Sequence, residues 1–161
     1  MVTRSVGTKM KKLCLTAYLL MFASQASAWV LKEFTPANVS SISVTIDDKA
    51  TDACWTNISE VKRYAEDKLE LSGFNVVRGS DGTRTSGSHF VFFLQVHAYR
   101  HQDLCYGNVD IMLYTPAKVN EMFAPLMVGN GSAVFQGYEK VNQLSLKQVE
   151  VFMDEIQNPS G

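Results

Sequence analysis

The sequence predicts an α+β fold, in which a mostly antiparallel sheet of four to five strands carries two main helices on one face. Alternating apolar and polar residues, typical of strands, are concentrated in the middle of the chain, over 89–115. Apolar residues at helical spacing occur on both sides of them, over 57–72 and 145–156. The predicted order is β-α-β-β-β-(short α)-β-α, in a single domain of residues 29–161.

The first strand and the first helix are predicted from local pattern. Residues 39–46 alternate, with Ile42, Val44 and Ile46 on one face. Asn57 is a good N-cap and is followed three residues later by Glu60, as in a capping box, so the helix is expected over 57–72.

Two longer strands are predicted in the centre. A short strand over 74–78 and a loop over 79–88 without apolar residues precede them. Residues 89–100 and 106–115 then alternate, with a turn near Asp103 between them. Their predicted core face carries Phe90, Phe92, Leu94, Val96, Ala98, Val109, Ile111 and Leu113.

The last third of the chain is expected to hold a short helix, a strand and a helix. Thr115-Pro116 is typical of an N-cap followed by proline, and Pro125 limits the helix to one or two turns within 116–127. A strand over 132–141 and the helix over 145–156 follow.

The N-terminus has the pattern of a secretory signal peptide over residues 1–28. Four basic residues without an acid precede an apolar run of 11 residues, Leu13 to Ala23, and Ala26-x-Ala28 provides the small residues of a cleavage site. The run is shorter than the roughly 20 residues of a spanning helix, although an uncleaved membrane anchor is the alternative. A bacterial protein of the periplasm or the extracellular space is expected, beginning at Trp29 and without a membrane span.

The charge of the expected mature chain argues against nucleic acid as a partner. The signal contains four of the 15 basic residues and none of the 16 acidic ones, which leaves 11 basic against 16 acidic residues and a net charge of −5. An acidic protein without a basic patch is repelled by phosphates.

Cys54 and Cys105 are the two cysteines that remain after the signal. In an oxidising compartment two cysteines usually pair, so a disulfide is predicted between them, with two buried free thiols as the alternative. No C-x-x-C motif suggests a redox activity.

Motifs for catalysis, metal or cofactor binding are missing from the sequence. It has no G-x-S-x-G, no P-loop and no calcium loop. His97 and His101 are four residues apart, which in a strand separates them by about 13 Å at about 3.3 Å per residue, too far for one ion. No cofactor and no metal are therefore expected.

The second face of the predicted sheet is unusually apolar. Val91, Phe93, Met112 and Tyr114 lie on it, whereas the two main helices can cover only the other face. Either the segment 116–127 covers these residues, or they form an interface with a protein partner or with a second copy.

These observations favour an exported, non-catalytic binding or accessory module, such as an envelope assembly or adhesion component, that acts through protein–protein contacts. The alternative is a small secreted enzyme or ligand-binding protein. Its polar sheet face would place His97, Tyr99, His101 and Asp103 near a pocket.

Overall fold

The structure is a computed structural model, and it describes residues 27–79, 89–120, 122–137 and 140–159. The predicted loop over 80–88 and most of the predicted signal, 1–26, lie outside the described residues. The elements are β1 (Ser27–Val30), β2 (Ser41–Ala50), α1 (Ile58–Leu71), β3 (His89–His101), β4 (Leu104–Val119), β5 (Met122–Gly137) and α2 (Lys140–Gln157). No helix within these ranges is long and apolar enough to cross a bilayer.

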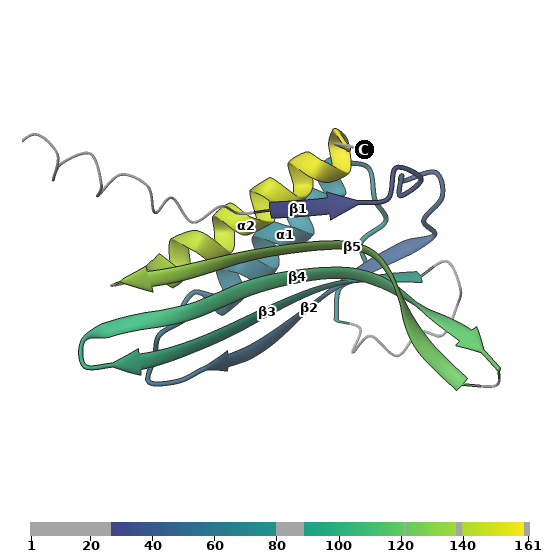
Figure 1. Ribbon diagram of the computed structural model, residues 1–161. Helices are drawn as coiled ribbons and strands as arrows, with labels where there is room; N and C mark the ends of the chain where they lie inside the picture. Colours follow the sequence, from purple (N-terminus) through teal and green to yellow (C-terminus); the bar gives the residue numbers. More distant parts are fainter. Residues whose placement is uncertain (1–26, 80–88, 121, 138–139, 160–161) are drawn as a thin grey trace, which may run out of the picture.

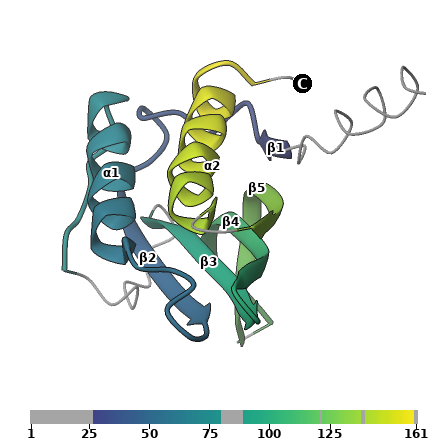
Figure 2. The ribbon, with the colours of Figure 1, turned by 90° about the vertical axis from the view of Figure 1, so that its left-hand side faces the viewer.

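The strands form one sheet in the order β1-β5-β4-β3-β2, and both helices pack on the same face of it (Figures 1 and 2). Strands β2 and β3 are parallel, and the other three neighbouring pairs are antiparallel. A parallel pair needs a crossover connection, and α1 lies in it. The predicted fold class, with its mostly antiparallel sheet and its two helices on one face, is confirmed.

The core lies between the sheet and the two helices. Phe92 of β3 and Phe152 of α2 are both fully buried, and their rings meet edge to face at 5.4 Å. Helix α2 approaches β5 closely at Gly131, where an added Cβ would lie 3.0 Å from the Phe152 ring and 2.9 Å from the Gln148 amide nitrogen. A residue without a Cβ therefore lets α2 and β5 approach each other without displacing these two side chains.

Helix α1 begins after Asn57 as predicted, but the predicted capping box is wrong. The Asn57 side chain makes no capping hydrogen bond. Its Oδ1 accepts from the Trp55 indole at 2.9 Å, and its Nδ2 donates to Glu60 Oε2 and to the carbonyl of Asn142. Asn57 thus ties the start of α1 to α2.

The short helix predicted within 116–127 is also wrong. Strand β4 continues to Val119 and β5 starts at Met122, with Pro116 opposite Pro125. The Thr115 hydroxyl donates to the carbonyl of His89 at 2.8 Å and does not cap a helix. Cross-strand pairing overrides the weak local signal for a helix. The β4–β5 hairpin extends beyond Tyr114, the last residue of β4 that pairs with β3.

We call residues 116–119 and 122–127 the arm. Figure 1 shows the arm extending beyond the other strands and bending away from the helices.

Smaller differences concern element boundaries. The predicted strand over 74–78 is reduced to a single bridge between Ile42 and Val76. The strand predicted over 132–141 is the second half of β5, and α2 begins at Lys140, five residues before the predicted start. Strand β1 was not predicted, and its first two residues lie within the predicted signal peptide.

Candidate interaction surface

The face of the sheet opposite the two helices, here called the outer face, carries the four residues predicted as an interface. Strand register places Val91 beside Tyr114 and Phe93 beside Met112, so the four side chains form a two-by-two group, the apolar block. The Phe93 and Tyr114 rings lie 6.4 Å apart. Phe93, Met112 and Tyr114 are half-buried, whereas Val91 is 1% exposed. The accessible surface of the block therefore comes from the first three residues.

One row of the apolar block leads through a polar residue, Asn130, to the edge of the sheet. Met112 is opposite Asn130 of β5, and Asn130 is opposite Trp29 of β1, whose side chain is 46% exposed. Tyr114 is opposite Met127, at the base of the arm. Partial burial raises the pKa of Tyr114 above its ordinary value, in keeping with its place in a largely apolar group.

A polar row crosses the outer face next to the apolar block. Its members are register partners on four successive strands: Asp47, Gln95, Asp110 and Ser132. The Gln95 amide donates to Asp47, and the Ser132 hydroxyl and the Asn108 amide donate to Asp110. The outer face therefore has an apolar part bordered by a hydrogen-bonded polar part, the composition of a protein interface.

The row favours the charged form of Asp47. The hydrogen bond from Gln95, and after it the one from Lys49, lowers the pKa of Asp47 below its ordinary value. Lys49 Nζ lies 3.1 Å from Asp47 Oδ1.

The residues of the alternative enzyme or ligand-binding hypothesis are spread along the end of the sheet. His97 is opposite Asn108, Tyr99 is opposite Tyr106, and His101 ends β3. Asp103 is exposed in the turn to β4. Within the described ranges, no group of three or more His, Cys, Asp or Glu residues could hold a metal ion. Strand register thus places His97, Tyr99 and His101 at alternate positions along β3, with Asp103 in the turn beyond it.

A depression lies between α1 and α2. It is lined by Glu60, Arg63, Tyr64, Asp67, Leu146 and Glu150. The Tyr64 hydroxyl donates to Glu150 at 2.8 Å, which joins the two helices across the depression.

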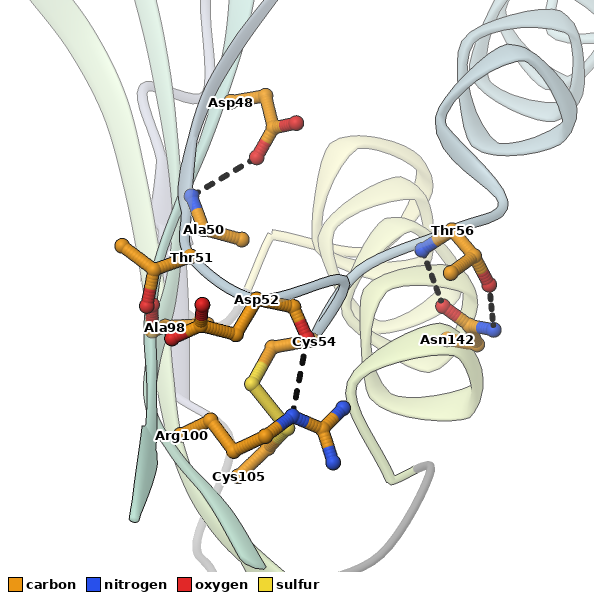
Figure 3. Close-up of a disulfide and its surroundings, with 10 residues drawn as sticks. All are labelled: Asp48, Ala50, Thr51, Asp52, Cys54, Thr56, Ala98, Arg100, Cys105 and Asn142. Atoms are coloured by element: carbon orange, nitrogen blue, oxygen red, sulfur yellow. Dashed lines mark hydrogen bonds between the residues drawn. A yellow bond between two sulfur atoms is a disulfide. The ribbon is translucent and has the colours of Figure 1, made fainter.

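The predicted disulfide between Cys54 and Cys105 is present (Figure 3). It joins the β2–α1 connection to the start of β4, with the Cα atoms 5.7 Å apart. Arg100 donates to the carbonyl of Asp52 at 2.9 Å, and Asn142 exchanges two hydrogen bonds with Thr56. The connection that positions α1 over the sheet is thus held to β3, β4 and α2 at once.

The sequence interpretation missed the edge of the sheet formed by β1 and β5. Six of the nine large apolar side chains that are exposed in the described residues lie along it. They are Trp29, Leu31, Met122, Leu126, Met127 and Val134. One signal could have identified this edge: β5 contains no charged residue in 16 positions, which is unusual for a strand with one open side.

The fold and its surfaces thus define a small α+β domain with an outer sheet face left clear of both helices. No protein-family model matches the chain, and no curated protein matches it in sequence.

Among solved structures, a variant of the PelC dodecamer from Paraburkholderia phytofirmans is similar, with a TM-score of 0.52 and 10% identity over 83% of this chain and 98% of that chain. A second PelC dodecamer from the same organism gives a TM-score of 0.48 at 10% identity, over 84% and 97%. At this identity the likeness to the first shows a shared fold.

Proposed function

We propose that the protein is an exported, non-catalytic accessory module that assembles with further copies of itself through its outer sheet face. The observation that carries the proposal is the apolar block on a face that neither helix covers. Burying the Phe93 side chain in a contact contributes roughly 1.5–3 kcal/mol. The neighbouring polar row supplies the rim that restricts the contact to one register.

Export is supported by the disulfide and by the N-terminal sequence pattern. The Cys54–Cys105 bond is compatible with an oxidising compartment, and disulfides are rare in the bacterial cytosol. The signal-like pattern over 1–28 adds to this, with the mature chain beginning at Trp29 in the periplasm or outside the cell.

Self-association is supported by the shared fold with PelC, which is a dodecamer. An accessory role without catalysis is supported by the dispersed positions of His97, Tyr99, His101 and Asp103. A contact with another envelope protein through the same face is the second possibility, since the apolar block would serve either partner.

The proposal is tested by Phe93→Asp in the mature protein. We expect this variant to sediment as a monomer at concentrations where the wild type is assembled, because a carboxylate in the apolar block loses its solvation on contact. Its thermal melting should stay close to that of the wild type, since Phe93 is only half-buried. Tyr99→Asp is the matched control, because it adds the same charge to the same face of β3 outside the block.

Two results would contradict the proposal. If Phe93→Asp stays assembled, the block is not the contact. If Phe93→Asp and the milder Phe93→Thr both unfold, the block is part of the internal core. A wild-type protein that is monomeric and binds no envelope protein would remove the basis of the proposal altogether.

A further inference from the structure

We infer that the open edge of β5, residues 133–137, adds the arm of a second copy as an extra strand, so that copies associate head to tail. The inference rests on the proposed self-association and adds a second contact, at the edge of the sheet, to the one proposed at the outer face.

The edge of β5 lacks the features that normally prevent strand addition. Within the described ranges, β1 pairs with only four residues of β5, Gly129–Ser132, and the Leu31 N–H adds one bond to the Val128 carbonyl. In the part of the chain that the structure describes, no strand pairs with residues 133–137 on that side, and these residues contain no charge and no proline. Val134 is 62% exposed in the middle of this stretch. Long, uncharged, uncovered edges are templates for pairing with another chain.

The opposite edge of the sheet is protected. Strand β2 carries Asp47, Asp48 and Lys49 near its end. At its start, the segment after α1 occupies the edge, since Ile42 exchanges backbone hydrogen bonds with Asn75 and Val77. Of the two sheet edges, only the β5 edge is therefore suited to receive a strand.

The chain also supplies a segment suited to be the added strand. The β5 half of the arm, residues 122–127, is extended and uncharged, and Met122 and Leu126 are 70% and 55% exposed. Pro125 lacks an N–H, so the other residues of the segment donate the backbone hydrogen bonds to an added neighbour. The Met122 and Leu126 side chains are left in water unless another surface covers them, which favours their burial in a contact.

The arm and the edge must meet between copies. Leu126 and Val134 lie on one strand, eight residues apart, which at about 3.4 Å per residue separates them by roughly 27 Å. A contact between two different patches is heterologous, and repeated heterologous contacts close into rings when the rotation allows. The expected net charge of −5 makes copies repel elsewhere, so uncharged surfaces are the ones that can approach closely.

A buried amide behind the same part of β5 adds an independent argument. Gln148 of α2 is fully buried, and neither of its side-chain polar atoms has a hydrogen-bond partner in the described structure. It lies next to Gly131, as does the Ala28 side chain. Cleavage after Ala28 would remove half of β1 and extend the open edge to Gly131, where an added strand or its water could satisfy this amide.

The test uses cross-linking of the mature protein with a short bismaleimide, because the native cysteines are already paired. A chain carrying both Leu126→Cys and Val134→Cys should give a ladder of covalent species beyond the dimer. Chains with either single substitution should give none, since only an arm-to-edge contact brings the two positions together.

A second measurement uses charge. Val134→Lys should weaken assembly at least tenfold in sedimentation, because a lysine protects an edge, whereas the neutral strand-former Val134→Thr should not.

The outcomes separate this inference from the proposed function. A Val134→Cys chain that cross-links by itself to a dimer would overturn the head-to-tail contact, since it indicates two β5 edges meeting. If the wild type assembles and Val134→Lys assembles equally well, the edge contact is overturned and the outer face remains as the interface. Wild type that is monomeric at every concentration would overturn the inference and the proposed self-association together.

Discussion

Loss of the Cys54–Cys105 disulfide should remove a large part of the stability of this domain. We consider the paired substitution Cys54→Ser with Cys105→Ser, which avoids leaving one thiol free for wrong pairing. The bond closes a loop between residues that are 51 positions apart. In the chain-entropy model, closing a loop of this length restricts the unfolded chain by about 4 kcal/mol.

The structure indicates that nearly all of this free energy should appear as lost stability when the bond is removed. Both cysteines are at least 95% buried, and the connection around them is already held by the hydrogen bonds of Arg100 and Asn142. The native state therefore changes little when the bond is removed, and the effect arises mainly in the unfolded chain. Stability should fall by up to about 4 kcal/mol, which corresponds to roughly 14 °C in melting temperature for a domain of about 133 residues.

Urea unfolding followed by Trp55 fluorescence measures the effect, since Trp55 is buried beside Cys54. The dependence of the free energy of unfolding on urea should also become steeper, because an unfolded chain without the cross-link exposes more surface. Added reductant should destabilise the wild type and leave the double variant unchanged. A loss below about 1 kcal/mol, or free thiols in the exported wild type, would refute the reasoning.

Two further predictions concern packing and pH. Gly131→Val should destabilise the fold by about 1–3 kcal/mol and Gly131→Ala by less, because a Cβ there contacts Gln148 and Phe152. Thermal melting measures the effect. If both variants have the melting temperature of the wild type, the close approach of α2 to β5 is contradicted. The folded-state pKa of Asp47 is lowered, first by the hydrogen bond from Gln95. The stabilising contribution of Asp47 is therefore present above the ordinary carboxyl pKa and is lost as the pH falls through the lowered value. The difference in stability between wild type and Asp47→Asn should shrink on acidification, and a difference that grows would contradict the hydrogen bonding of the polar row.

The sequence predicted the features that depend on pattern within single elements. Alternation along β3 and β4 was strong enough to identify both strands and to assign Phe92 and Leu113 to the core, where both are fully buried. The same alternation placed Val91, Phe93, Met112 and Tyr114 on the other face, and strand register brings them together as expected. The disulfide followed from the small number of cysteines.

The features that depend on pairing between distant segments were not predicted. The arm was interpreted as a short helix because apolar residues near Pro116 recur at helical spacing, whereas pairing of β4 with β5 decides the outcome. Strand β1 was missed because four residues have no periodicity of their own and lie at the end of an export signal. The position of β5 at an edge follows from the strand order, and the absence of charged residues from β5 was the one sequence signal that bore on it.

The measurement that tests the central claim most directly is native mass spectrometry of the protein after export. We predict an assembly of several copies, which dissociates under denaturing conditions into a single species. The mass of that species should correspond to a chain beginning at Trp29, less two hydrogens for the disulfide. An exported chain that stays monomeric at every concentration, or one that retains residues 1–28, would contradict the account.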